Sequence, residues 1–284
     1  ILMKYKIYKS IDNWIYVAFK YNCLRIINRL LLIFNKKVNL NLVIRYKNGM
    51  KMMIPSESLN NYFNPLSIYH EYFSEFKEHY PEFVINELDI CIDIGAHIGF
   101  LLIPALIETP KINYYCFEAD KNNYKRLKEN IRLNKITSSN IIVENTAISD
   151  VDGEMEFIKG KTSTTGRLKN IKSYKIKNGK RSYFGKNGKA SVIKSARLDS
   201  IYKKNNITYC QLLKIDIEGG EYLLFKGGMN FLKHTKYMVI ELHPVEDYHS
   251  SEIINEIQKA GFTIKTKHYK NGCSILYCNN LNLI

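Results

Sequence analysis

Hydrophobic and polar residues follow two different rhythms along the chain, and the change falls near residue 85. Between Ile11 and Phe34, apolar residues recur at roughly helical spacing with Lys and Arg mostly between them, as in an amphipathic helix. After residue 85, short continuous apolar runs alternate with amphipathic stretches. We therefore predict a basic, mainly helical N-terminal extension over residues 1–84 and a larger domain over residues 85–284.

The larger domain repeats the order strand, loop, helix. Predicted strands lie at Leu88–Ile94, Ile112–Phe117, Asn140–Val143, Gln211–Ile217 and Tyr237–Leu242, and predicted helices at Ile98–Glu108, Asn122–Asn134, Glu221–Lys233 and Ser251–Ala260. Further extended pieces end at Ile158, and Phe262–His268 with Ser274–Cys278 forms a closing pair. Strands alternating with helices predict an α/β fold with a mostly parallel sheet covered on both faces. Ligands of such sheets bind beyond the carboxyl ends of the strands.

Charge is concentrated in two segments of the chain. The composition, with 45% hydrophobic residues in 284, is that of a globular protein and excludes disorder as the main theme. The net charge is +15, but residues 1–51 carry +10 and residues 159–190 carry +11 without a single acid, so the rest is mildly acidic. We interpret 159–190 either as a solvated insertion or as a lid that recruits an acidic acceptor, such as a phosphate-linked or uronic sugar.

The N-terminal helix and the cysteines bear on localisation. Lys20, Arg25 and Arg29 interrupt the apolar run, so no stretch reaches the roughly 18 uncharged residues of a membrane span. Two interpretations stay open: the helix packs on its own domain, or it docks on an anionic membrane surface or a partner. The six cysteines show no CxxC and are interpreted as reduced core residues. We expect a cytoplasmic protein, with peripheral contact at the inner membrane surface as the second possibility.

A glycine turn follows the first predicted strand, and an acid closes the next. Gly95 can adopt a positive φ and let backbone approach a ligand, and Gly99 allows close packing of helix and strand. The G-x-x-x-G spacing lacks the middle glycine of the dinucleotide fingerprint. Glu118 lies 23 residues after Gly95, near the interval at which a carboxylate binds a ribose diol. Together these residues predict an adenosine-type cofactor.

Five motifs in this order resemble the FkbM-type methyltransferases: DIGAHIGF, CFEAD, NTAISD, LLKIDIEGGEYLLFKG and VIELHP. The resemblance covers roughly residues 85–278 and implies the class I methyltransferase (Rossmann-like) fold, with seven strands, a reversed last strand and S-adenosylmethionine as cofactor. It places Glu118 at the ribose hydroxyls. The residues it places on the methionine and ribose side are Asp93, Gly95, Ala96 and Gly99, and those flanking the adenine are Asn145, Thr146 and Ala147. His97 stands where the family often has Asn and is kept as a cofactor-binding candidate, while the N-terminal extension has no counterpart.

Acids and a histidine gather at the ends of the fourth and fifth main strands. A hydroxyl acceptor must lose its proton to a base while it is held in line with the methyl carbon. Of these groups, we predict His243 as the base, Glu218 as the next candidate, and Asp216 as a catalytic-site residue that also faces the methionine part of the cofactor. The alternative for His243 is a ring satisfied by nearby backbone.

A metal is the competing use for these acids. Oxygen ligands suit magnesium, but nothing in the sequence fixes three of them, and the ligand spacing of zinc sites is missing. We therefore predict no metal.

Two enzyme classes fit these features. The first is an O-methyltransferase acting on a sugar, a glycan or another small molecule, acidic or not. The alternative is an RNA methyltransferase, suggested by the sequence pI of 9.3. No N/D-P-P-[YF] motif of base methylation occurs, and the basic residues are not spread around the predicted cleft, which argues against a nucleic-acid substrate. A third interpretation is a scaffold that kept the fold and lost the reaction.

Overall fold

The computed structural model describes residues 42–46, 49–54, 68–137, 140–160, 163–177, 180–183, 190–269 and 271–283. The chain divides into two compact units, Ile1–Phe63 and Asn64–Ile284. In the first unit, β1 (Leu42–Arg45) and β2 (Lys51–Ile54) pair as an antiparallel hairpin. The predicted amphipathic helix over 11–34 lies outside the described residues, so both interpretations of it remain predictions.

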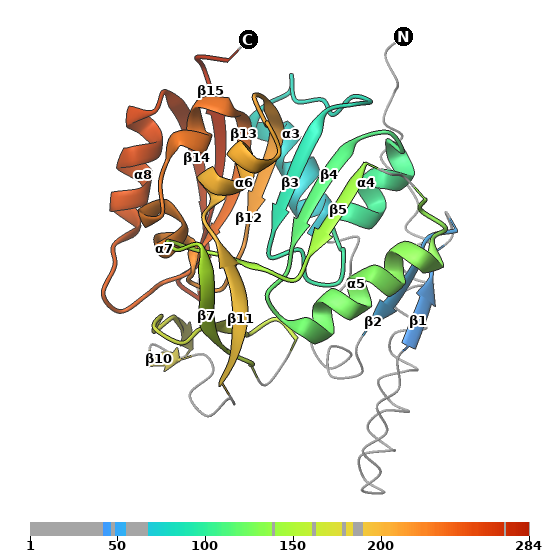
Figure 1. Cartoon of the computed structure of the whole chain (residues 1–284). Helices are drawn as coiled ribbons and strands as arrows, with labels where there is room; N and C mark the ends of the chain where they lie inside the picture. Colours follow the sequence, from blue (N-terminus) through green and yellow to red (C-terminus); the bar gives the residue numbers. More distant parts are fainter. Residues whose placement is uncertain are drawn as a thin grey trace, which may run out of the picture. The chain divides into compact units, whose positions relative to one another are not determined.

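A seven-stranded sheet organises the second unit (Figure 1), with the strand order β14-β15-β13-β12-β3-β4-β5. Its strands are β3 (Ile90–Ile94), β4 (Asn113–Phe117), β5 (Ile141–Glu144), β12 (Cys210–Ile215), β13 (Thr235–Leu242), β14 (Phe262–His268) and β15 (Ser274–Asn280). Of these seven strands, β15 alone runs opposite to the other six. The predicted class I sheet with its reversed last strand is confirmed, because each strand predicted for it lies within two residues of the observed one.

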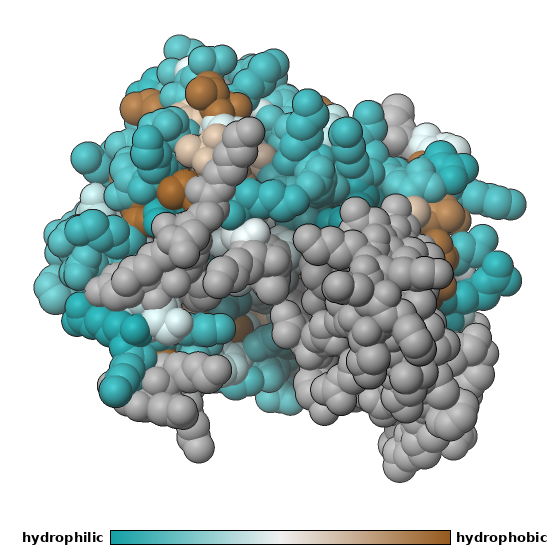
Figure 2. All heavy atoms as spheres, turned by 90° about the horizontal axis from the view of Figure 1, so that it is seen from below, coloured by the Kyte–Doolittle hydropathy of each residue, from teal (hydrophilic) through white to brown (hydrophobic). Residues whose placement is uncertain are grey.

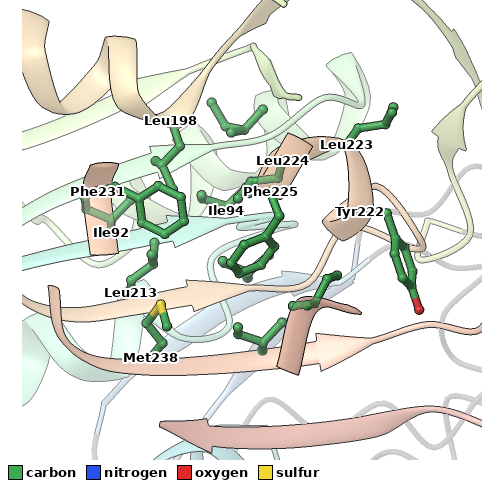
Figure 3. Close-up of a cluster of buried hydrophobic side chains, with 14 of the residues drawn as sticks. Ile92, Ile94, Leu198, Leu213, Tyr222, Leu223, Leu224, Phe225, Phe231 and Met238 are labelled. Atoms are coloured by element: carbon green, nitrogen blue, oxygen red, sulfur yellow. The ribbon is translucent and has the colours of Figure 1, made fainter. Parts of the chain in front are cut away.

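One face of the sheet packs against three helices: α6 (Leu198–Lys204), α7 (Glu221–Lys226) and α8 (Ser250–Lys259). Alternate residues of β13, Met238 and Ile240, point into this core. Figure 3 shows Phe225 of α7 beside Leu213 and Met238 of the neighbouring strands. Burying each such side chain contributes about 1.5–3 kcal/mol, so this core fixes where the strand ends lie.

Helices also cover the other face (Figure 1). The π-helical turn η2 (His70–Ser74) continues into α3 (Glu75–His79). Its Phe76 is fully buried and meets Tyr237 edge-on, with ring centroids 5.3 Å apart. This packing attaches residues 68–80 to β13. The remaining helices are α4 (Leu102–Glu108) and α5 (Lys121–Leu133).

Two predicted helices end or begin elsewhere. The helix expected from Ile98 begins only at Leu102, because His97 and Gly99 have positive φ values of 52° and 91°, which a right-handed helix excludes. The helix expected over Glu221–Lys233 ends at Lys226. A glycine pair, with Gly228 at φ 135°, interrupts it before the short 3₁₀ helix η3 (Asn230–His234).

The basic segment 159–190 is not simply a loop. A second sheet has the order β6-β11-β7-β8, with β6 (Ala147–Ile148), β7 (Gly153–Ile158), β8 (Arg167–Leu168) and β11 (Ala190–Ala196). A separate hairpin joins β9 (Tyr174–Lys177) and β10 (Lys180–Tyr183). Arg167 is buried and donates to the carbonyls of Leu168 and Ile171. Within the described part of this segment, Arg167, Leu168, Ile171 and Ser173 are therefore buried rather than solvated, and the lid interpretation stays a prediction.

Cys91, Cys116, Cys210, Cys273 and Cys278 are buried and form no disulfide, while Cys23 lies outside the described residues. None of the helices in the described part of the chain is long and apolar enough to cross a membrane.

On the face seen in Figure 2 the described residues are mainly hydrophilic, and the hydrophobic ones form small separate patches.

Candidate functional site

Backbone hydrogen bonds hold the first residues of the turn after β3. The amides of Gly95 and Ala96 both donate to the carbonyl of Phe117, at 2.9 and 3.1 Å. Gly95 has a φ of 79°, and a Cβ there would lie 1.8 Å from the carbonyl oxygen of Asp216. Glycine is therefore required at this position both for its conformation and for its contact with the end of β12. Gly99 is tight as well, since its Cβ would lie 2.7 Å from Leu127.

Glu118 lies directly beside this turn. Its Oε2 accepts the amide of His97 at 2.7 Å, and its Oε1 accepts the amide of Asp120 at 2.8 Å. Burial raises the pKa of Glu118 to about 7, although both hydrogen bonds act in the opposite direction. The acid and the glycine turn, paired in the sequence by spacing alone, are thus in contact. Each carboxylate oxygen keeps a further lone pair for a ribose hydroxyl.

The residues predicted to flank the adenine adjoin Glu118. Asn145 donates from Nδ2 to the carbonyls of Glu118 and Ala119, at 2.7 and 3.0 Å. Asn145 and Thr146 line a cavity of about 810 Å³, together with Ala119 and Asp120. Ala147 is buried in β6 and is not among the lining residues.

Asp93 has a buried partner, Lys214, that the sequence did not predict. Asp93 is buried, 3.2 Å from Nζ of Lys214, which also donates to the carbonyl of Gly95 at 2.8 Å. Burial lowers the pKa of Lys214, but the carboxylates of Asp93 and Asp216 outweigh it and raise the pKa above its ordinary value. Lys214 is therefore charged, and it links the glycine turn to Asp93. Burial lowers the pKa of His97 to about 3, so its ring is neutral.

Acidic side chains gather around His243 beyond β12 and β13. Its Nδ1 lies 3.1 Å from Oε1 of Glu221, and its Nε2 lies 3.5 Å from Glu218 and 3.7 Å from Glu241. Burial lowers the pKa of His243, but these carboxylates outweigh it and raise the pKa well above its ordinary value. We call Asp216, Glu218, Glu221, Glu241 and His243 the acid cluster.

Two carboxyl groups of the acid cluster have raised pKa values. Burial raises the pKa of Glu218 to about 8 and that of Glu241 to about 7. Neighbouring carboxylates add to both shifts, and His243 opposes them. The structure thus brings together all three predicted catalytic residues, and it leaves their catalytic roles as predictions.

Tyr72 of η2 enters the acid cluster and was missed in the sequence. Its hydroxyl lies 3.3 Å from Oδ2 of Asp216 and 3.3 Å from Oε2 of Glu241. Burial raises the pKa of Tyr72 well above its ordinary value, so the hydroxyl keeps its proton and donates it. No local pattern could identify this residue, because it is 144 positions from Asp216 and arrives through the packing of α3.

Part of the basic segment borders the acid cluster. The amide of Tyr174 donates to the carbonyl of Pro244 at 3.0 Å, and Ser173 forms a bridge with Val245. The amide of Ile176 donates to the carbonyl of Asn271 at 2.7 Å. The strand β9 therefore follows the segment directly after His243.

These features can be compared with known proteins. A family model described as the methyltransferase FkbM domain matches residues 93–264, more than half of the chain. The chain belongs to the FkbM methyltransferase family. Its methyl donor is the donor of that family, S-adenosylmethionine, and the glycine turn, Glu118 and the adjoining cavity fit an adenosyl group.

One characterised relative and two solved structures illustrate the similarity of this FkbM chain to other methyltransferases. The hexuronic acid methyltransferase AglP of Haloferax volcanii is 24% identical over 158 residues, covering 56% of this chain and only 57% of that protein. The METTL16 methyltransferase domain is 12% identical with a TM-score of 0.49, covering 92% of this chain and 97% of that one. Magnesium protoporphyrin IX methyltransferase from Synechocystis PCC 6803 is 9% identical with a TM-score of 0.44, covering 96% and 99%.

Proposed function

We propose that this methyltransferase methylates a hydroxyl oxygen of a sugar or glycan, and that the acceptor carries an acidic group such as that of a hexuronic acid. The observation that carries the proposal is the acid cluster beside the glycine turn. A hydroxyl needs a base at the moment of transfer, whereas an acceptor nitrogen with a lone pair does not. Several oxygens and an imidazole at these strand ends supply one.

In this proposal, separate residues of the site bind the cofactor and orient the acceptor. Bound S-adenosylmethionine supplies a methyl group on a positively charged sulfur. Gly95 and Glu118 would hold its methionine and ribose parts, and Asp216 is the member of the acid cluster whose backbone adjoins the glycine turn. The main contribution of such an enzyme is to hold the acceptor oxygen in line with the methyl carbon. Lys214 and Tyr72 fix the carboxylates around that line.

Glu218 is the best placed base. It follows β12 in a turn where its own φ is 55° and that of Gly219 is 100°, so the carboxylate stands off the strand. It faces Nε2 of His243, which offsets its negative charge. His243, surrounded by three carboxylates, is better suited to stabilise charge than to accept the proton itself.

Two observations favour an acidic sugar as acceptor. The similar protein AglP is named a hexuronic acid methyltransferase. In addition, β9 brings a basic segment to the rim of the acid cluster, where it can attract a carboxylate that the acid cluster would repel. The phosphodiester backbone of RNA carries a negative charge at every nucleotide, so an RNA strand lying across the acid cluster would meet this repulsion repeatedly, which disfavours the RNA alternative.

Transfer of labelled methyl groups tests this function. The full chain is incubated with labelled S-adenosylmethionine and, separately, with hexuronic-acid oligosaccharides, with neutral oligosaccharides of the same length, and with total RNA. We expect label in the acidic oligosaccharides, in an alkali-stable ether linkage. Label in RNA alone, or an alkali-labile ester on the sugar carboxylate, would overturn the proposal.

A further inference from the structure

Three different ligand atoms converge beside the acid cluster. The side chains of Glu241, His243 and Cys273 each bring one such atom, and all three atoms lie within 4.8 Å of one another. Glu241 lies in β13 and His243 directly follows the last residue of that strand, Leu242, so both side chains lie at its carboxyl end. Cys273 reaches them because β15 pairs antiparallel with β13, with Leu242 opposite Ser274. The pairing thus places Cys273 next to His243.

The separations around His243 suit a shared ion. Its Nε2 is 3.7 Å from Oε1 of Glu241 and 3.5 Å from Oε2 of Glu218. Both distances exceed the usual hydrogen-bond length of about 2.7–3.2 Å. Two ligand atoms that each lie about 2.0–2.2 Å from a tetrahedral zinc ion are about 3.4 Å apart.

His243 is oriented as metal-binding histidines are. Its Nδ1 lies 3.1 Å from Oε1 of Glu221, which is fully buried. The same oxygen accepts the amides of Ile217 and Gly219, at 3.1 and 3.3 Å, so it cannot turn away. Histidines that bind metals usually donate their other ring N–H to such a carboxylate, which fixes the tautomer and directs the lone pair. The ring nitrogen on the side away from Glu221 is Nε2, which lies 3.5 Å from Oε2 of Glu218 and 3.7 Å from Oε1 of Glu241.

Carboxyl groups outnumber cationic side chains around this point. Among the described residues, Lys214 and His243 are the cations in contact with the buried and half-buried carboxyl groups, which are Asp93, Asp216, Glu218, Glu221 and Glu241. Charges taken out of water need a partner. A divalent ion bound there would displace the proton of the Cys273 thiol and one ring proton of His243, and it would take their place as the positive charge beside these carboxyl groups.

We propose that Glu241, His243 and Cys273 bind a divalent transition-metal ion of the zinc type. A thiolate and an imidazole select such ions over magnesium and calcium, which prefer oxygen ligands. No ligand spacing marks the site in the sequence, because the ligands come from the end of β13 and from the turn before β15. The site stands beside Glu218, where a cation would draw charge from an acceptor hydroxyl, but the proposal does not depend on which acceptor is used.

A cobalt titration tests the site. The full chain is freed of metal with a chelator and titrated with Co²⁺, and the absorbance is recorded. We expect one equivalent to bind, with a sulfur-to-cobalt charge-transfer band that Zn²⁺ abolishes. Cys273→Ala should remove the band, and the matched Cys278→Ala, a buried cysteine of β15 outside the cluster, should keep it.

Two further variants test the site while leaving the thiol of Cys273 in place. Glu241→Gln, at a partly exposed side chain, should weaken Co²⁺ binding while keeping the sulfur band. Glu221→Gln should weaken binding by about 10–100-fold, because it frees the orientation of His243. Circular dichroism confirms that each variant is folded. Failure of the folded wild type to bind one equivalent, or a sulfur band that survives Cys273→Ala, would refute the site. The titration reads metal binding without methyl transfer, so it is decided separately from the proposed function.

Discussion

At the edge formed by β3, β4 and β5, most of the cofactor-side contacts join residues between 95 and 145, and each of these hydrogen bonds has at least one backbone partner. Gly95 and Ala96 bond to Phe117, and Asn145 bonds to the carbonyl of Glu118. At the edge formed by β12 and β13, the contacts run between side chains from four separate segments. Tyr72, Glu218, His243 and Cys273 come from η2, from the turn after β12, from the end of β13 and from the turn before β15.

This contrast separates two kinds of function. Backbone contacts define a shape that stays the same whatever the acceptor, which suits a cofactor. Side-chain contacts from distant segments can be altered one at a time, which suits the recognition and activation of an acceptor. Changes at the first edge should therefore weaken or abolish cofactor binding, and changes at the second should reduce transfer while the cofactor still binds.

The largest effect is expected for Gly95→Ala. The new Cβ would sit 1.8 Å from the carbonyl oxygen of Asp216, in a conformation that side chains rarely adopt. We expect a loss of about 3 kcal/mol in the free energy of unfolding, together with the loss of cofactor binding. Chemical denaturation and calorimetry measure the two effects.

Gly153→Ala is the matched control for Gly95→Ala. Gly153 also has a positive φ, of 135°, but a Cβ added there would meet no atom within 4 Å. The substitution should cost only the backbone strain, about 1–3 kcal/mol, and leave cofactor binding intact. Equal effects of the two substitutions would show that the contact with Asp216 is unimportant.

Glu218→Gln should separate transfer from binding. The amide keeps the shape of the side chain but cannot take a proton, so we expect kcat to fall about 100-fold. Cofactor affinity, measured by calorimetry, should stay at the wild-type value. Glu256→Gln on α8, an exposed acid paired with Lys259, serves as the control and should transfer normally. A kcat within about twofold of wild type for Glu218→Gln would assign the base elsewhere.

Cofactor binding should depend on pH through Glu118. Only its ionised form accepts hydrogen bonds from both ribose hydroxyls, and the pKa of the free protein's carboxyl is about 7. Affinity should therefore fall as the pH is lowered through this value, by about tenfold between pH 8 and pH 6. Glu118→Gln should bind more weakly at pH 8 and lose the pH dependence. A flat profile for the wild type would contradict the ribose role.

Tyr72→Phe should give the smallest effect. It removes one hydroxyl that lies between Asp216 and Glu241 and leaves the packing of the ring unchanged. We expect about a fivefold lower kcat, equivalent to about 1 kcal/mol, with normal cofactor affinity. Tyr80→Phe, whose hydroxyl bonds to the carbonyls of Thr263 and Tyr277, should lower stability without changing kcat. An unchanged kcat in Tyr72→Phe together with a lowered kcat in Tyr80→Phe would contradict the role of Tyr72 in the site.

The contrast also explains what could be predicted from the sequence. The strand runs, the glycine turn and Glu118 are local patterns with fixed spacing, and they predicted the sheet and the cofactor edge. The early end of α7 was missed because helical periodicity continues past the glycines that stop it. The strands within 159–190 were missed because pairing with β7, rather than their own charged sequence, stabilises β8.

Side-chain partners at the second edge depend on pairing across the fold. Lys214 lies inside one of the five motifs, but its contact with Asp93 requires β3 and β12 to be neighbours in register. Tyr72 and Cys273 belong to no motif. They reach the acid cluster only because α3 packs on β13 and because β15 pairs with β13.

The division between the two edges is tested most directly by one calorimetric experiment. Wild type, Glu118→Gln and Glu218→Gln are titrated with S-adenosylmethionine in the same buffer at about pH 8, where Glu118 is mostly ionised. We predict one site in the wild type, about tenfold weaker binding in Glu118→Gln, and wild-type affinity in Glu218→Gln. No heat of binding in the wild type, or an equal loss in both variants, would contradict the account.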